Sequence, residues 1–157
     1  GESAAGQGWS SGAFTPPTGT TLEVEVFARV REPSFHRVDM VLGLASGPVD
    51  AFSDLAAIVR FNAEGTVDAR NGSVYQSDSG FQFRYDHIYA VRFVVDLAAR
   101  RYSAYIRTYD TPGPGDLIAS SYAFRTEQAA TGSLDTFAHI VDSSTGTLWA
   151  CVQRVAP

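Results

Sequence analysis

Hydrophobic and polar residues alternate along most of the chain, which is the pattern of β-strands with one buried face. Over residues 22–30, Leu, Val and Ala occupy the even positions, while Glu, Phe and Arg occupy the odd ones. Further apolar or alternating runs follow at short intervals and are separated by turn residues. The strands predicted from these runs cover residues 38–45, 55–61, 66–70, 73–76, 89–96, 102–109, 117–124, 137–141 and 147–155.

Local turn and helix signals agree with a chain built mainly of strands. Asn71-Gly72, between residues 66–70 and 73–76, predicts a hairpin, because a type I′ turn needs positive φ at both central residues. Residues 125–130 favour a single helical turn with Thr126 as its N-cap. No longer stretch has helical periodicity, so the fold class is all-β, either a sandwich or a barrel of antiparallel strands.

The first 20 residues differ in composition from the rest of the chain. They are rich in Gly, Ser, Thr and Pro, with Trp9 and Phe14 as isolated apolar residues. Because such a composition is typical of flexible connections, we expect residues 1–20 to form a linker or N-terminal extension. Residues 21–157 then form one domain, large enough to bury its own core without disulfides.

Composition and charge exclude several classes of partner. The net charge is −5, and all 12 basic residues are arginine. Nonspecific nucleic-acid binding needs a basic face, so no nucleic-acid partner is expected. No apolar run reaches the roughly 20 residues that span a bilayer, so no membrane partner is expected either. The single cysteine, Cys151, lies in an apolar segment and is expected to pack as a small core residue.

Several segments are similar to a known family. Residues 38–44 and 54–62 resemble the middle of a concanavalin A-like, laminin G-type jelly roll. Residues 65–72 and 89–105 continue the resemblance, which covers about residues 20–155. It implies an antiparallel two-sheet β-sandwich (jelly roll) and favours this architecture over a barrel.

The resemblance also implies a function. Bacterial modules of this appearance are appended to secreted polysaccharide-degrading enzymes. The chain is therefore expected to be a secreted, non-catalytic carbohydrate-binding module that is covalently linked to a catalytic domain and binds a polysaccharide or oligosaccharide. No signal-peptide pattern opens the chain, so secretion implies that a targeting segment has been removed. Two alternatives stay open: a structural or adhesion β-sandwich that packs on a neighbouring domain, and a small polysaccharide lyase or glycoside hydrolase.

Candidate catalytic residues are few. Glu23 and Glu25 share a strand face, but they lie on the first predicted strand and lack the third acid of the jelly-roll glucanases. His139 lies among apolar residues and is expected to be structural. Residues 125–127 are only faintly similar to the Arg-Ser-Glu motif of certain lyases. There is neither a nucleophile elbow nor a metal-binding histidine pair, so we expect no enzymatic activity.

Polar residues on two neighbouring strands form a candidate ligand-binding surface. Alternation places the polar residues of 60–62 and of 68–70 on one face if the two strands pair. Planar carboxylate, amide and guanidinium groups hydrogen-bond sugar hydroxyls, and an aromatic ring packs on a pyranose. The alternative is a solvated sheet face or an Arg–Asp network that only stabilises the sandwich. The predicted ligand-binding residues are Arg60, Asn62, Asp68, Arg70, Asn71 and Tyr75.

The charge of the ligand is a further hypothesis. Every cationic contact must come from arginine, whose planar fork matches a carboxylate. Arg60 and Arg70 on neighbouring strands therefore favour an acidic polysaccharide such as a uronan. Asp68 opposes this hypothesis, because it would neutralise Arg70 and leave a site suited to neutral sugars.

Calcium is the one cofactor that the sequence brings into consideration. The resemblance to laminin G-like and concanavalin-like modules implies a structural or ligand-bridging calcium ion. Carboxylate and carbonyl oxygens suit this cation. The candidate ligands are acids at predicted loops and strand ends, although no contiguous acidic loop is present: Asp39, Asp54, Asp135 and Asp142.

Overall fold

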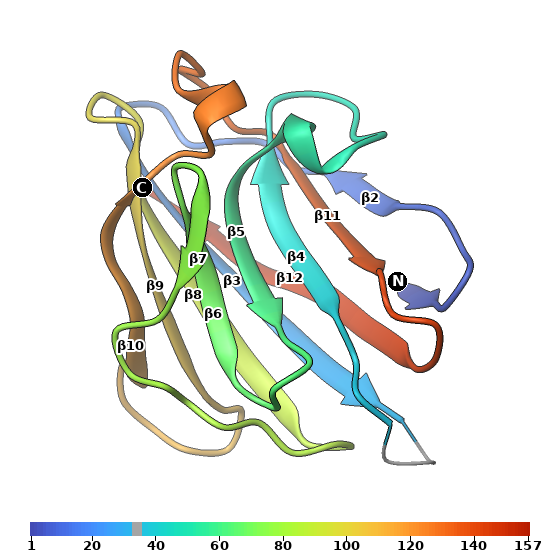
Figure 1. The fold of residues 1–157 in the computed structure, drawn as a ribbon. Coiled ribbons are helices and arrows are strands. Elements are labelled where there is room, and N and C mark those ends of the chain that lie inside the picture. The colour runs from blue at the N-terminus through green and yellow to red at the C-terminus, as the bar shows by residue number, and fades with distance from the viewer. Residues whose placement is uncertain (33–35) are drawn as a thin grey trace.

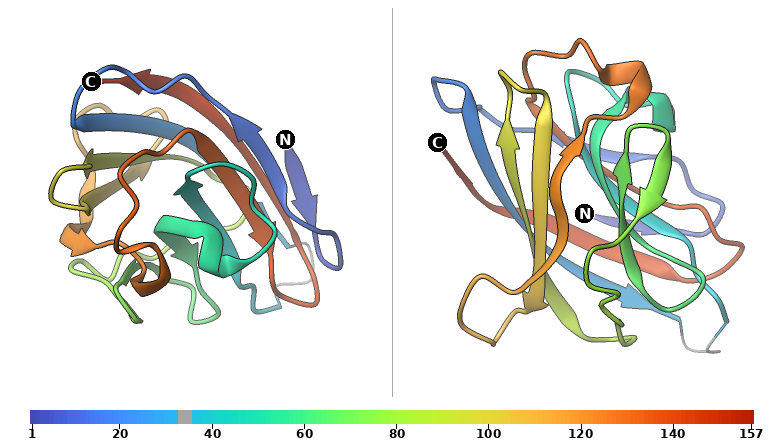
Figure 2. Two further views of the ribbon diagram at one scale, coloured as in Figure 1. Left: turned by 90° about the horizontal axis from the view of Figure 1, so that it is seen from above. Right: turned by 60° about the vertical axis from the view of Figure 1, so that its left-hand side comes forward.

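The computed structural model describes residues 1–32 and 36–157. In these residues, two antiparallel six-stranded sheets pack face to face as a curved sandwich (Figures 1 and 2). Sheet A contains, in spatial order, β1 (Glu2–Ala4), β12 (Thr147–Ala156), β3 (Thr21–Arg31), β8 (Ile88–Asp96), β9 (Arg101–Thr108) and β10 (Asp116–Ala123). Sheet B contains β2 (Ser10–Ala13), β11 (Thr136–Val141), β4 (Met40–Ala45), β5 (Leu55–Phe61), β6 (Val67–Asn71) and β7 (Val74–Gln76). The predicted all-β sandwich is confirmed.

The alternating pattern of β3 explains why the two sheets pack together. Its even-numbered residues from Leu22 to Val30 are at most 1% exposed, and its odd-numbered residues lie on the outer face of sheet A. Aromatic rings from both sheets meet them in the core; Phe61 of sheet B and Tyr89 of sheet A, for example, have ring centroids 6.1 Å apart. This buried apolar surface is the main stabilising contribution to the fold.

The register of the β5–β6–β7 meander places the predicted ligand-binding residues. Arg60 of β5 lies opposite Asp68 of β6, and Arg70 lies opposite Tyr75 of β7. The strand pairing expected from the sequence is therefore confirmed.

The turn between β6 and β7 differs from the prediction by one residue. Asn71 pairs with Val74, so Gly72 and Ser73 are the central residues, and Gly72 has φ +58°. Positive φ at the first central position alone is typical of a type II′ turn, not of type I′. Asn71 is the last residue of β6, and its side-chain oxygen accepts a hydrogen bond from the Ala123 N–H at 2.9 Å.

Two short strands lie in the segment that the sequence assigns to a linker or extension. β1 pairs with β12, and β2 pairs with β11 along the edge of sheet B. Trp9, between these strands, packs edge to face on Phe52 at 5.0 Å. Residues 1–20 are therefore part of the sandwich and not a linker that precedes it.

Two short 3₁₀ helices stand at the same end of the sandwich (Figure 2, left). η1 (Phe52–Asp54) precedes β5, and η2 (Thr126–Gln128) follows β10. The Gln128 amide donates a hydrogen bond to the Ser53 carbonyl oxygen at 2.8 Å, which joins the two. Thr126 is the first residue of η2 and not its cap; Arg125 holds that position without a side-chain capping bond.

The single cysteine does not lie where the sequence led us to expect it. Cys151 lies on the outer face of sheet A and is partly exposed, because the neighbouring residues of β12, Ala150 and Val152, take the inward positions. The expectation of a core cysteine is therefore wrong. In the described part of the chain, no helix has the length and apolar character needed to cross a membrane.

Candidate functional site

The outer face of sheet B carries a shallow hollow that contains both apolar and charged side chains. Its floor belongs to a small apolar cluster, separate from the main core, that includes Val41 and Ile58. The hollow has a volume of about 210 Å³. It is lined by Asp39, Val41, Phe52, Arg60, Tyr75, Arg125 and Asp142.

An ion-pair network fixes one side of the hollow. The Arg60 guanidinium donates two hydrogen bonds to the Asp68 carboxylate, from Nε at 2.9 Å and from Nη2 at 2.7 Å. The Asn62 amide donates a third hydrogen bond to Asp68 at 2.9 Å. Bidentate pairs of this kind hold both partners in one geometry. Three of the predicted ligand-binding residues therefore form a single pre-ordered unit.

Tyr75 lies in the middle of this surface, between arginines. The Arg60 Cζ atom is 3.9 Å from the centre of its ring, and the Arg70 Cζ atom is 5.1 Å from it. Burial raises the pKa of the Tyr75 hydroxyl, although Arg60, Arg70 and Arg125 act in the opposite direction. The ring is thus neutral and is held in place by cation–π contacts.

Arg70 and Asn71 differ in role from the other predicted residues. Arg70 donates a hydrogen bond from Nε to the Gly72 carbonyl oxygen at 3.0 Å. The predicted neutralisation of Arg70 by Asp68 is wrong, since Asp68 bonds to Arg60 across the strands instead. Asn71 ties the hairpin to β10, so its contact in the structure is with the backbone.

The four acids proposed as calcium ligands occupy two separate places. Asp39 and Asp142 flank the start of β4 and the end of β11, and the Asp142 N–H donates to the Asp39 carbonyl oxygen at 2.8 Å. Burial raises the pKa of the Asp39 carboxyl, with a further contribution from Asp142. Asp54 accepts hydrogen bonds from the backbone at the start of η1, and Asp135 accepts one from the Gly47 N–H.

These positions do not fit the predicted calcium site. Asp54 and Asp135 lie near Ala45, the last residue of β4, whereas Asp39 directly precedes its first residue. Within residues 1–32 and 36–157, no three side chains of His, Cys, Asp or Glu gather closely enough to hold a metal ion. Calcium needs six to eight oxygen ligands in one place. No step of the function is therefore assigned to calcium.

Five of the seven residues that line the hollow were not among the predicted ligand-binding residues, and two of these five come from the short 3₁₀ helices. Phe52 comes from η1, and Arg125 comes from the start of η2. The Arg125 N–H donates to the Ala56 carbonyl oxygen at 2.9 Å, which anchors this segment on β5. For Arg125, the signals in the sequence were the predicted turn at residues 125–130 and the faint similarity of residues 125–127 to a lyase motif. Neither signal placed this segment beside Tyr75.

Solved structures show what the sandwich is similar to, although no protein-family model and no curated protein sequence matches the chain. A sialidase matches with TM-score 0.65 and 11% identity over 99% of this chain and 15% of the sialidase chain. A GH131 β-glucanase catalytic domain from Podospora anserina matches with TM-score 0.57 and 10% identity, over 97% of this chain and 66% of that one. The exoplasmic/lumenal domain of VIP36, bound to Ca²⁺ and Man3GlcNAc, matches with TM-score 0.56 and 11% identity, over 94% of this chain and 84% of that one.

The chain has a jelly-roll fold. The resemblance to concanavalin A-like sandwiches is thereby confirmed at the level of the fold. The same fold carries lectins and glycoside hydrolase domains, so it does not by itself decide between binding and catalysis.

The acids considered for glycoside hydrolysis lie on the opposite side of the molecule from the hollow. Glu23 and Glu25 share the outer face of sheet A, as the alternation predicts. An Arg92 nitrogen lies 3.4 Å from a Glu23 oxygen, and an Arg107 nitrogen lies 3.2 Å from a Glu25 oxygen. Both carboxylates thus belong to a ladder of cross-strand ion pairs.

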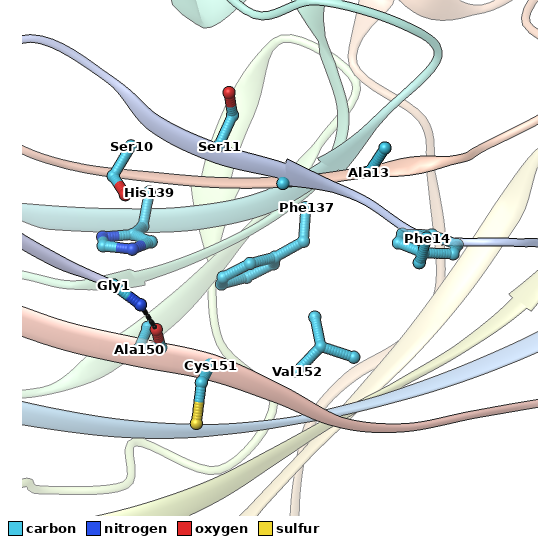
Figure 3. A pocket seen from close by; sticks show the side chains of 11 residues that line it. Gly1, Ser10, Ser11, Ala13, Phe14, Phe137, His139, Ala150, Cys151 and Val152 are labelled. Atoms are coloured by element: carbon cyan, nitrogen blue, oxygen red, sulfur yellow. Dashed lines mark hydrogen bonds between the residues drawn. The ribbon is translucent and has the colours of Figure 1, made fainter.

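A second cleft opens at the edge of the sandwich, between β2, β11 and β12 (Figure 3). Phe137 lies in its middle, with Phe14 and Val152 beside it and His139 toward one end. The His139 ring Nδ1 lies 2.8 Å from the Ser3 hydroxyl, and burial lowers the pKa of His139 to about 4. The histidine is buried and hydrogen-bonded, as the sequence led us to expect of a structural residue.

Proposed function

We propose that the chain is a carbohydrate-binding module and that a sugar ring binds in the hollow on the outer face of sheet B. The observation that carries this proposal is the arrangement of Tyr75 and Phe52 beside fixed planar polar groups. Sugar recognition combines C–H packing on aromatic rings with hydrogen bonds from carboxylates and guanidinium groups. The hollow offers both within about 210 Å³, which is below the size of a typical pocket for a drug-sized ligand and suits one ring.

Pre-ordering supports this function. Arg60 is held by two hydrogen bonds to Asp68, and Asp68 is held in turn by Asn62. Binding loses affinity when side chains must be immobilised, so groups that are already fixed favour recognition of a weakly binding ligand. The Man3GlcNAc-bound VIP36 domain and the GH131 β-glucanase catalytic domain among the similar structures support the same ligand class.

The proposed module acts as part of a longer secreted polypeptide, where it holds a catalytic domain at a polysaccharide. The match to the sialidase supports this role, because a domain of this size there makes up 15% of a much longer chain. In this proposal the module itself performs no catalysis.

Binding to a panel of soluble polysaccharides, measured by isothermal titration calorimetry, tests the proposal. We expect Tyr75→Ala and Phe52→Ala to weaken binding at least about tenfold, the effect of losing an aromatic anchor. Tyr109→Ala is the control, because Tyr109 is 51% exposed and packs on Phe27 of sheet A. Equal affinities for all three variants would remove the hollow as the site.

Two further outcomes separate the alternatives. Binding to no glycan at all would favour a structural sandwich that packs on a neighbouring domain. Release of reducing ends or of unsaturated uronates during incubation would make the chain a hydrolase or a lyase.

A further inference from the structure

Three arginines surround Tyr75, but they differ in what already holds them. The Arg60 guanidinium bonds twice to Asp68, and its Nη1 lies 3.6 Å from Asp39. The Asp68 side chain is only 12% exposed, so the charge of Arg60 is already compensated by a buried carboxylate, which a ligand anion would have to displace to form the same two-bond contact. Displacing a buried partner is strongly unfavourable, because it leaves that charge uncompensated.

Arg70 is held by the hairpin that it belongs to. Its Nε donates to the Gly72 carbonyl oxygen, and its Cζ atom lies 5.1 Å from the ring centre of Tyr75. The two arginines on which the sequence-based hypothesis of an acidic ligand rests are therefore both engaged within the protein.

Arg125 is held differently, by a carboxylate at the surface. Its Nε lies 3.0 Å from Glu127 Oε2, and its Nη2 donates to Glu127 Oε1 at 3.1 Å. The Arg125 side chain is 14% exposed, whereas the Glu127 side chain is 46% exposed. Ion pairs with an exposed partner contribute little to stability and are screened by salt.

The geometry of this pair is also imperfect. Among the described residues, Arg125 Nε is buried and has no aligned hydrogen-bond partner, despite its short distance to Glu127. Glu127 follows Arg125 by only two residues, so the backbone of η2 limits how its carboxylate can approach. A carboxylate that arrives from outside can take up the parallel two-bond geometry that guanidinium prefers.

The hollow is polarised along its length. Arg125 stands at the end where β5 begins, since its N–H bonds to the Ala56 carbonyl oxygen. Asp39 and Asp142 stand at the other end, beside Met40, the first residue of β4. A sugar that carries a carboxylate fits this field in one orientation, with its acidic group at Arg125 and its hydroxyls toward the aspartates.

We propose that Arg125 selects acidic sugars by binding a ligand carboxylate, and that Glu127 occupies the guanidinium until the ligand replaces it. This inference rests on the proposed function, since it specifies the ligand class of the same hollow. The ligand is a uronic acid residue of a polysaccharide, and the exchange breaks one ion pair at the surface and forms another.

Titration calorimetry at low salt with matched polysaccharides tests the inference. The probes are polygalacturonate, alginate and hyaluronate, each compared with its carboxyl-reduced, neutral counterpart. We expect Glu127→Gln to bind the acidic form about three- to tenfold more tightly, because the internal competitor has lost its charge. We expect Arg125→Gln to bind it at least about tenfold more weakly, the loss of one charge-assisted contact. Glu127→Gln should bind the neutral forms like the parent protein.

Matched controls separate selection from a general change in surface charge. Arg31 and Asp86 form a comparable exposed pair, with N–O distance 2.9 Å, outside the hollow. Asp86→Asn removes the same charge as Glu127→Gln and should leave all affinities unchanged. An exposed Glu127 tolerates substitution, so its variant reports on binding even if Arg125→Gln fails to fold.

The outcomes are distinguishable from those of the proposed function. Two results would overturn the selection of acidic sugars and leave the sugar site in place. One is tighter binding of the neutral polysaccharides than of the acidic ones. The other is an affinity for the acidic polysaccharides that is unchanged in Glu127→Gln, as it should be in Asp86→Asn. Failure of every polysaccharide to bind overturns both proposals.

Discussion

The Tyr102 hydroxyl of β9 lies 2.6 Å from the carbonyl oxygen of Arg70 on β6, so a side chain of sheet A bonds to the backbone of the sheet that carries the hollow. The same hydroxyl lies 2.9 Å from the Ile58 carbonyl oxygen on β5. Burial raises the pKa of Tyr102, which keeps its hydrogen available as a donor. The two strands behind the hollow are therefore joined to the opposite sheet at one buried atom.

Tyr102→Phe removes that atom and leaves buried carbonyl oxygens with one donor fewer. We expect the free energy of unfolding to fall by about 1–3 kcal/mol, the cost of losing a buried hydrogen bond. Urea denaturation with linear extrapolation measures the change. Tyr105→Phe, on the outer face of the same strand, is the control. A loss no greater than in the control would show that the link between the sheets adds no stability.

His139 makes stability depend on pH in the acidic range. Burial lowers its pKa to about 4, whereas the unfolded chain binds the proton near the ordinary histidine pKa of 6.5. The contribution of the neutral histidine is therefore complete above pH 6.5 and is lost as the pH falls through about 4. The gap between the two pKa values corresponds to about 3 kcal/mol at the acidic limit.

Thermal melts across this pH range measure the effect. A change of about 3 kcal/mol lowers the melting midpoint by roughly 6–12 °C for a domain of this size. His139→Gln should flatten this part of the profile, while His87→Gln, an exposed histidine that stacks on Tyr89, should retain it. Equal slopes in the two variants would assign the acid sensitivity to other groups.

Gly43 is required by the close approach of β4 to β5. A Cβ atom at this position would lie 2.6 Å from the Ala57 carbonyl oxygen and 3.1 Å from a Leu55 methyl group. We expect Gly43→Ala to destabilise the fold by about 1–3 kcal/mol, as overpacking does elsewhere. Gly12→Ala in β2 is the control, since a Cβ atom there would have no neighbour within 4 Å. Chemical denaturation of both variants measures the difference, and equal stability would contradict the expected clash.

The placement of the four candidate calcium ligands leads to a further expectation. Because Asp39 and Asp142 are separated from Asp54 and Asp135 by the length of β4, the melting midpoint should be the same in EDTA and in added calcium. A cation that bound only the folded state would raise the midpoint by mass action. If calcium does raise it, loss of that rise in Asp142→Asn would place the ion beside Asp39.

Strands with a clear apolar or alternating pattern were predictable from the sequence, and strands that form only because a partner strand is available were not. The bounds of β5 were predicted to the residue, because Leu55–Phe61 is a mostly apolar run between turns. β2, with the sequence SSGA, has no such pattern and forms because β11 offers it a free edge. The pairing of β2 depends on the assembled sheet, and the local sequence of this strand carries no signal for it.

The candidate site was likewise predictable from the sequence only in part. Strand alternation placed Arg60 and Asp68 on one surface, as the structure also does. It put Tyr75 only at the rim of that surface, whereas in the structure the Arg60 guanidinium lies over the Tyr75 ring. It did not place Arg125 there, because that residue reaches the hollow through the contact of η2 with η1, about 75 residues away in sequence. Contacts between loops depend on the finished fold and leave no periodic signal.

The position of β3 between β8 and β12 has a consequence for synthesis of the protein. β8 can pair with β3 as soon as it leaves the ribosome, but the other edge of β3 finds its partner only when Thr147–Ala156 has emerged. Until then β3 presents a long edge with unpaired backbone groups, and such edges recruit other chains. A nascent chain that stalls before Thr147 is therefore prone to aggregate, and completion of β12 is the step that closes the fold.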